Sequence, residues 1–307
     1  MNYTLHQLKV FLSVVENRSI TKASQELFLT QPAVSIQLGK FQEQFSIPLT
    51  ELVGRQVYIT EFGQEIAEIS RNILQQVDTI NYKTKSFENK LAGRLKISVV
   101  STGKYVMPYF LSGFMAMHKG IDLVMDVTNK SSVIRSLEEN TVDFSLVSVI
   151  PDELKINTVP LLQNKLYLVG GKVLLQDIEK FSRKQFENHP MLYRETGSAT
   201  RKAMEDFIQL HQIPVHKKIE LTSNEALKQA VVAGLGFSVM PLIGLKNELG
   251  NGDLRIIPYK NLPIITQWNL IWLQSKNLSP VANAFLNYIQ KEKEEIIKNK
   301  FSWYENY

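Results

Sequence analysis

Short polar side chains gather at the start of a helix near the N-terminus. Thr30 is typical of a helix N-cap, and Pro32 falls in the first turn, where its missing N–H leaves no hydrogen bond unmade. At helical spacing the sequence then exposes Gln31, Ser35 and Gln37, which can donate to and accept from base edges in a DNA major groove. A helical hairpin inside a core is the alternative, and the local pattern alone favours neither.

A second set of hydroxyl and amide side chains follows predicted strands or begins predicted helices in the later part of the chain. Ligands of open α/β sheets bind beyond the carboxyl ends of strands, often at helix N-termini. The set is neutral and polar, as a site for a small carboxylate or phosphate would be. Ser and Thr also cap helices routinely, so capping remains an equal alternative for any one residue. As a set they favour a binding site: Ser101, Thr102, Thr128, Asn129, Ser148, Thr196, Ser198 and Thr200.

No motif predicts catalysis, a metal or a cofactor. The chain has no cysteine, which excludes disulfides and thiolate chemistry, and its five histidines show no metal-binding spacing. Gly234-Leu-Gly236 is only a fragment of a dinucleotide-binding fingerprint, and no GxSxG or P-loop motif occurs. We therefore expect a protein that is not an enzyme.

Three predicted helices position the first set. The first spans residues 4–17, and the other two form a helix-turn-helix at about residues 20–39, with Thr21 as the expected N-cap and Phe28 on the inward face. Residues 46–61 then predict a hairpin wing anchored by Leu49 and Leu52. The first helix repeats apolar residues at helical spacing: Leu5, Leu8, Phe11, Leu12 and Val15.

Arg55 lies at the turn of this predicted wing. A wing arginine commonly enters a minor groove, and a solvated loop charge is an equal alternative.

A long helix follows the wing over residues 62–91. Its apolar residues recur every seven positions, which is typical of a coiled coil. Because this helix stands between two predicted domains, pairing with a second copy explains it better than packing within one chain. The expected dimerisation residues are Ile66, Ile73, Val77, Ile80 and Phe87.

Residues 92–307 alternate predicted strands and helices, which favours a parallel sheet covered by helices on both faces. We expect a first lobe of about residues 92–162 and 266–307 and a second of about residues 163–265. A closing helix from Pro280 is expected to pack back on the first lobe. A solute-binding lobe pair is the alternative for this part, but it does not explain residues 1–90.

The 307 residues are 44% hydrophobic and 21% charged, as in an ordinary soluble globular protein, and carry a net charge of +5. Residues 1–60 hold five basic and four acidic residues, a net of +1, so any attraction to DNA comes from a few placed groups. The N-terminal residues are amphipathic and no run reaches the ~18 apolar residues of a membrane span. These features indicate a cytoplasmic protein with no membrane partner.

The order of helix-turn-helix, wing, long helix and two-lobed α/β domain resembles the LysR-type transcriptional regulators. The most specific motifs are Leu8–Val15, Ser19–Leu38, Thr60–Gly63 and Gly234–Pro241. The resemblance implies an all-α winged helix-turn-helix head (residues 1–61), a linker and dimerisation helix (62–91), and a periplasmic-binding-protein-like effector domain (92–307).

The resemblance also implies roles for the two residue sets. Gln31, Pro32 and Ser35 would contact base edges, Arg55 the minor groove, and Thr21 and Thr30 phosphates. The hydroxyl-rich set would bind an inducer, expected to be anionic. The implied partners are double-stranded DNA, a second copy or a tetramer, and RNA polymerase.

Two segments, Val100–Pro108 and Arg194–Arg201, look most like those of regulators of carbon-fixation operons. Two positions depart from the family pattern: Ile36 stands where Arg or Lys is usual, and Thr50-Glu-Leu52 replaces Phe-x-Arg. Both departures remove positive charge near DNA, so the alternative is a small-molecule sensor with weak or lost DNA binding.

Overall fold

The helices of the N-terminal unit begin at side-chain caps. The structure is a computed structural model that describes residues 2–53, 56–86, 91–176, 178 and 181–307. In it, α1 (Leu5–Asn17) starts at a capping box between Thr4 and Gln7. Ser19 caps α2 (Ile20–Glu26), and Thr30 caps α3 (Gln31–Gln42), with Pro32 in the first turn as predicted. The prediction that Thr21 caps α2 is wrong, because the hydroxyl that accepts the first-turn N–H is that of Ser19.

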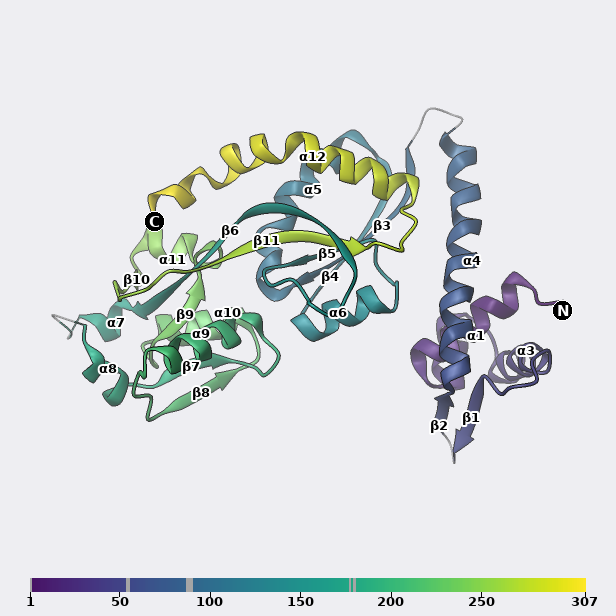
Figure 1. Cartoon of the computed structure of the whole chain (residues 1–307), viewed down its shortest axis with the longest axis horizontal. Coiled ribbons are helices and arrows are strands. Elements are labelled where there is room, and N and C mark those ends of the chain that lie inside the picture. Colours follow the sequence, from purple (N-terminus) through teal and green to yellow (C-terminus); the bar gives the residue numbers. More distant parts are fainter. Residues whose placement is uncertain (1, 54–55, 87–90, 177, 179–180) are drawn as a thin grey trace. The chain divides into compact units, whose positions relative to one another are not determined.

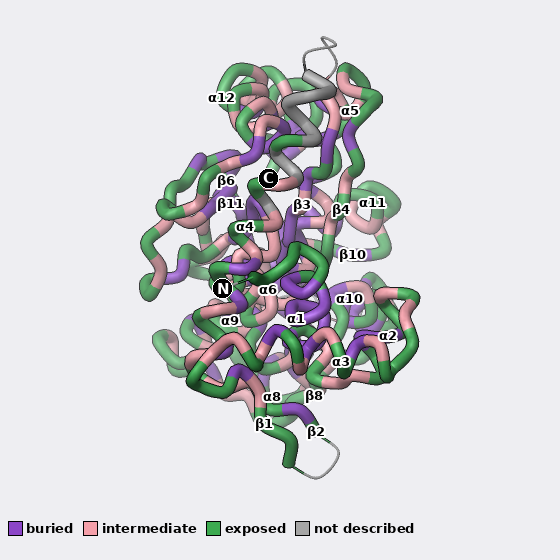
Figure 2. The backbone as a smooth tube through the Cα atoms, turned by 90° about the vertical axis from the view of Figure 1, so that its right-hand side faces the viewer, coloured by how far each residue is buried: buried purple, intermediate pink, exposed green. Residues whose placement is uncertain are grey.

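The strands β1 (Thr50–Val53) and β2 (Gln56–Ile59) pair antiparallel as a wing, and α4 (Glu61–Ser86) follows (Figure 1). Thr60 begins α4 by accepting the Gly63 N–H at 2.9 Å. Figure 2 shows the wing largely exposed. Leu49 is buried in the core, but Leu52 is 69% exposed, so of these two predicted anchors only Leu49 holds the wing, together with buried Val57 of β2.

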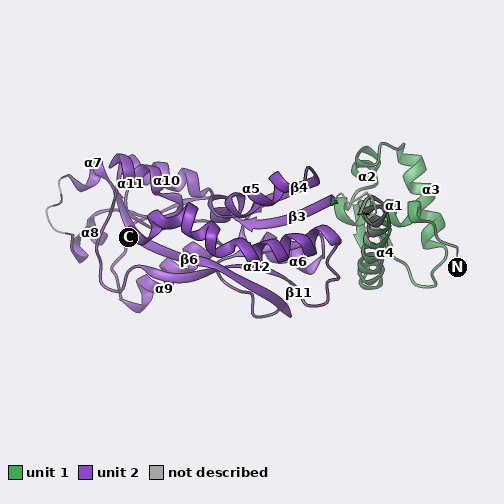
Figure 3. Ribbon diagram, turned by 90° about the horizontal axis from the view of Figure 1, so that it is seen from above, with its two compact units in different colours: residues 1–91 green, residues 92–307 purple. Residues whose placement is uncertain are grey.

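One core serves this unit of residues 1–91, which is distinct from residues 92–307 (Figure 3). Phe28 is not part of it: this residue is 95% exposed at a φ of 54°, because the turn between α2 and α3 reverses the chain there. Leu5 is also exposed. The core is formed by Leu8, Val10, Phe11, Leu12, Val14, Val15, Ala23, Val34, Leu38, Phe41, Leu49, Val57 and Ala67.

A seven-stranded mixed sheet organises residues 92–307, with strand order β10-β6-β11-β5-β3-β4 and β9 beside β6. The prediction of a wholly parallel sheet is wrong: β3 pairs parallel with β4 and β5, whereas β6 and β11 pair antiparallel with their neighbours. The strands of this sheet are β3 (Ala92–Val100), β4 (Gly120–Thr128), β5 (Phe144–Val147), β6 (Ile156–Gly171), β9 (Ser238–Pro241), β10 (Leu254–Ile256) and β11 (Ile264–Leu273).

The first lobe, as we define it, contains β3, β4 and β5 with η1 (Ser101–Tyr105), α5 (Met107–Met117) and α6 (Lys130–Glu138). The second contains a separate parallel pair, β7 (Met191–Arg194) and β8 (Lys218–Leu221), with β9 and β10. Because β6 and β11 run through both lobes, the lobe boundaries expected from the sequence stay a prediction. The helices of the second lobe are α7 (Lys172–Leu175), α8 (Arg183–Asn188), α9 (Ala199–Leu210), α10 (Asn224–Val232), η2 (Leu242–Gly244) and α11 (Lys246–Asn251).

The closing helix α12 (Pro280–Phe301) packs on α5 of the first lobe (Figure 1), with Phe285 against Phe114 and Phe301 against Phe110. After it, η3 (Ser302–Asn306) reaches β6, where the backbone N–H of Lys165 donates to the Tyr304 hydroxyl at 3.1 Å. The fold class of a winged helix-turn-helix head followed by a two-lobed α/β domain is confirmed. Within the described part of the chain, every helix is too short or too polar to cross a membrane.

Candidate functional site

The exposed face of α3 carries most of the residues predicted to contact DNA. Gln31, Pro32 and Ser35 are exposed and Gln37 is half-buried. On the opposite face, Val34, Leu38 and Phe41 are buried in the core and hold the helix against α1. The helix therefore turns a polar stripe outward from a rigid support, as a helix that enters a major groove requires.

The two predicted threonines lie beside this stripe. The Thr21 hydroxyl donates to Oε1 of Gln31 at 3.4 Å, which links the first turn of α2 to the first residue of α3. The Thr30 oxygen accepts the Ala33 N–H at 3.4 Å as the N-cap, and its own O–H is free to donate elsewhere. Arg55 lies outside the described residues.

The electrostatics of this face suit a polyanion. Between residues 20 and 42 the sequence has two lysines, Lys22 and Lys40, and one acidic residue, Glu26. The Glu26 carboxylate accepts hydrogen bonds from Ser13 at 2.7 Å and Asn17 at 2.5 Å, so it is tied to α1. No carboxylate lies on α3 itself.

Strand ends of both lobes converge on a cleft in the second unit. Six of the eight residues predicted to bind an effector line it: Ser101, Thr102, Asn129, Ser148, Ser198 and Thr200. Ser101 and Thr102 follow β3, Asn129 follows β4 and Ser148 follows β5. These residues lie together because the three strands are parallel and end at one edge of the sheet. The remaining lining residues are Val100, Lys130, Arg194, Glu195 and Ala199.

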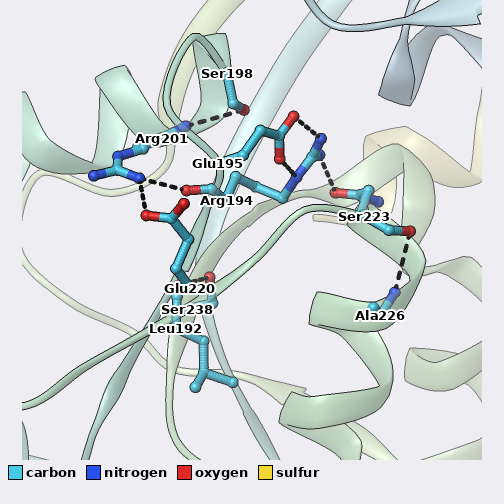
Figure 4. Close-up of polar contacts among 10 residues, drawn as sticks. Leu192, Arg194, Glu195, Ser198, Arg201, Glu220, Ser223, Ala226 and Ser238 are labelled. Carbon is cyan, nitrogen blue, oxygen red and sulfur yellow. Dashed lines mark hydrogen bonds and ion pairs between the residues drawn. The ribbon is translucent and has the colours of Figure 1, made fainter.

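Arg194 supplies a buried cation in this cleft, at the end of β7, and is only 4% exposed. Its Nε and Nη2 each donate to the Glu195 carboxylate at 2.8 Å, and Nη1 donates to Oδ1 of Asn224 at 3.4 Å (Figure 4). With Lys130, the charged groups in the cleft wall sum to +1. Sequence reasoning overlooked Arg194 and Lys130 as site residues. The available signal was a basic residue at the carboxyl end of a buried strand for Arg194, and a basic residue at the start of the helix after β4 for Lys130.

Two of the cleft residues also cap helices. Asn129 accepts the Ser132 N–H at 2.9 Å at the start of α6, and Ser198 accepts the Arg201 N–H at 3.4 Å at the start of α9. Capping and lining of the cleft therefore coexist in these residues. Thr196 instead lines a neighbouring wider groove, and Thr128 lines neither space.

The wider groove adjoins the cleft along Lys130, Ser198 and Ala199. The groove has a volume of about 1,100 Å³, whereas the cleft has a volume of about 20 Å³. Its apolar wall comes from Ile134, Val149, Ala203, Phe207, Leu210 and Ile264. The cleft itself has room for about one water molecule between its polar residues.

A polar link joins the two lobes beside the cleft. The Tyr105 hydroxyl of η1 donates to Glu225 of α10 at 2.9 Å, and Lys228 bridges Glu225 at 3.0 Å and Glu248 at 2.7 Å. Burial raises the pKa of Tyr105, so the phenol stays protonated as a donor. Burial of Glu225 acts to raise its pKa, but hydrogen bonds from Lys228 and Tyr105 outweigh this and hold the pKa below its usual value.

The heptad positions of α4 share one side of the helix, and the head core covers only the first part of that side. Ile66 packs against the head core, whereas Ile73 is 39% and Ile80 65% exposed, with Ile69 at 53% on the same outer face. Val77 is half-buried, and Phe87 lies outside the described residues. Ile69, Ile73 and Ile80 therefore form a row of exposed apolar side chains along α4.

Family models match nearly the whole chain. Residues 5–64 match the bacterial regulatory helix-turn-helix protein of the lysR family, and residues 88–294 match the LysR substrate binding domain. The second match alone covers more than half of the chain.

Curated relatives point the same way. The chain is 35% identical to the HTH-type transcriptional activator CmpR of Synechocystis sp., over 94% of this chain and 95% of that protein. It is 34% identical to the RuBisCO operon transcriptional regulator of Allochromatium vinosum, over 95% and 97%. The structure of the Synechocystis PCC6803 CcmR regulatory domain in complex with 2-PG is 31% identical, covers 66% of this chain and 98% of that chain, and superposes with a TM-score of 0.61. The chain therefore belongs to the LysR family and is a LysR-type transcriptional regulator similar to those of the carbon-fixation branch.

Proposed function

We propose that α3 reads the promoter through its exposed stripe. Gln31 and Ser35 contact base edges, Pro32 and Gln37 flank them, and the hydroxyls of Thr21 and Thr30 contact phosphates. The support for this assignment is the capped helix that turns these side chains outward, with its one neighbouring carboxylate tied to α1. Arg55 in the wing completes the contact in the minor groove.

The effector is a small anion bound in the interlobe cleft. The observation that carries this proposal is the convergence of hydroxyl, amide and cationic side chains from the ends of β3, β4, β5 and β7 on one space. Arg194 and Lys130 supply positive charge, and the N-terminus of the 12-residue helix α9 adds its partial positive charge. Thr128 and Thr196 contribute only from the periphery.

Effector binding changes the closure of the lobes. The cleft has a volume of about 20 Å³, far less than a carboxylate or phosphate with its substituents needs. Entry of the ligand therefore requires the lobes to part along β6 and β11. A ligand too large for the present cleft binds only the parted arrangement, and this difference in affinity shifts the population toward that arrangement.

The target is an operon of carbon fixation, and the regulator acts as an oligomer in the cytoplasm. The names of the relatives support the target, since they include a RuBisCO operon regulator. The exposed row of Ile69, Ile73 and Ile80 supports pairing through α4.

The test is a fluorescence-anisotropy titration of the full chain against the upstream region of its own gene and a scrambled duplex. We expect a specific complex at ~100 mM salt, with an affinity that falls as salt rises. Equal affinity for the two duplexes would leave the protein a ligand sensor without promoter recognition. Melting of the full chain with 2-PG, inorganic phosphate and acetate then tests the anion site, and no stabilisation by any of them would contradict it.

A further inference from the structure

Ile36 is a large apolar side chain on the exposed face of α3. It is 55% exposed, next to Ser35, whereas Val34 and Leu38 on the other face are buried. Pro32 and Lys40 lie four residues before and after it, so the three form one row along the helix.

Packing within the head does not explain Ile36. It is neither in the core cluster of the N-terminal unit nor among the partly buried apolar residues that pack against that cluster in the described structure. Burying such a side chain stabilises a folded protein or a complex, and at 55% exposure Ile36 has more than half of its surface still in water. A partner that covers α3 would gain this stabilisation.

The surroundings of Ile36 allow a close approach by DNA. Gly39, one turn later, has no atom within 4 Å of the position that a Cβ would take, so this side of the helix is open. The helix carries no carboxylate, and Lys40 provides a cation in its last turn. This distribution of charge suits a helix that enters a DNA groove lined by phosphates.

Within the major groove, the apolar group on a base edge is the methyl of thymine. We propose that Ile36 contacts a thymine 5-methyl group and so makes the regulator select an A·T pair at that position. The inference rests on the proposed insertion of α3 into the major groove and deepens it. It also reverses the expectation that replacing a basic residue by Ile36 only removes a contact.

The experiment uses the full chain and its own upstream duplex, with each thymine of the protected region replaced in turn by deoxyuridine. This change keeps base pairing and removes only the methyl group. We expect wild type to lose about threefold to tenfold in affinity at one or two positions. The Ile36→Ala variant should bind the thymine duplex more weakly and show no further loss with deoxyuridine at those positions.

Ser35→Ala is the matched control, because it alters the neighbouring exposed residue and should retain the deoxyuridine penalty. Ile36 is exposed, so melting should show that its variant is folded. A penalty that persists in Ile36→Ala, or its absence at every thymine in wild type, would overturn the inference while specific DNA binding stands. If wild type bound its own upstream duplex and a scrambled duplex equally well, both the proposed function and this inference would be overturned.

Discussion

The guanidinium of Arg194 is held by the carboxylate of its sequence neighbour Glu195 through two hydrogen bonds of 2.8 Å, in the wall of the interlobe cleft. Arg194 is only 4% exposed and Glu195 is half-buried. A carboxylate of the chain thus occupies the fork that an anionic effector would use. The ligand-free cleft is thereby neutralised at its most buried cation, and an incoming anion competes with Glu195 for it.

The Glu195→Gln substitution should strengthen anion binding and weaken the ligand-free fold. The amide leaves a buried guanidinium without its countercharge, which destabilises the ligand-free domain by roughly 1–3 kcal/mol. Calorimetry and melting with 2-PG, phosphate and acetate should show several-fold tighter binding and recovery of the lost stability.

Glu220→Gln is the control for this prediction, because Glu220 pairs with Arg201 and lines neither space (Figure 4). Equal anion affinity in both variants would show that Glu195 does not compete with the ligand. Arg194→Lys should abolish the binding, since an ammonium lacks the planar fork.

Replacing Gln31 should relax sequence discrimination. Gln31→Ala removes a side chain that can pair with a base edge, at a cost of about 1–3 kcal/mol for the preferred base and less for others. Anisotropy titrations against single-base variants of the promoter would measure it. An equal loss of affinity for all sequences would indicate that Gln31 contacts the DNA backbone and not a base edge.

Replacing Thr21 should weaken all sequences alike, because we assign its hydroxyl to a phosphate. The salt dependence and the affinity for a scrambled duplex are the measurements. A loss confined to the promoter would instead show that Thr21 acts by holding Gln31 through their 3.4 Å hydrogen bond.

Charges on the outer face of α4 should separate the subunits. Ile73→Glu with Ile80→Glu places like charges along the apolar row of a proposed coiled coil, so sedimentation should show monomers and promoter affinity should fall together. Glu68→Lys, also exposed on α4, should leave the oligomer intact. A monomer that still bound a full palindrome tightly would contradict pairing through this helix.

The link between the lobes should weaken in acid. The pKa of Glu225 is held below its usual value in the fold, so its stabilising effect is complete above about pH 4.5 and is lost as pH falls through the folded-state pKa. Melting of wild type and Glu225→Gln from pH 7 to pH 3 should therefore converge at the acidic end. A constant difference across this range would show that the carboxylate charge is irrelevant.

Tyr105→Phe tests the same link at neutral pH. Removal of the hydroxyl deletes the 2.9 Å hydrogen bond between the lobes, so the domain should lose about 1 kcal/mol and open more easily to ligand. Tyr109→Phe on α5 is the control, because its ring contacts Phe301 and the change leaves that ring in place. Unchanged anion affinity in Tyr105→Phe would argue against a role in closure.

Local signals were sufficient for the head and for most of the cleft. Thr30, Pro32 and Thr60 act through neighbours three or four residues away, so their roles follow from short stretches of sequence. Of the eight residues predicted to bind an effector, six line the cleft. They follow parallel strands or begin helices, and the carboxyl ends of parallel strands lie at one edge of a sheet. Local pattern misled at two positions. Thr21 and Ser19 are both good N-cap residues and lie two positions apart, so the sequence did not show which of them caps α2. Phe28 fits the apolar spacing of a helix, but it lies in a turn and its side chain is exposed.

Sequence patterns were enough to predict the helix-turn-helix, the heptad repeat of α4, the alternation of strands and helices after residue 92, and the family. The mixed sheet could be seen only in the folded chain, because the direction in which β6 and β11 pair with their neighbours depends on which distant strands meet. The register shift of β11 between Gln267 and Asn269 likewise exists only in the paired strands. Tertiary structure also decided that Arg194 is buried against Glu195 in the cleft and that Ile36 stands uncovered. Burial depends on which distant segments meet, and no local spacing records that.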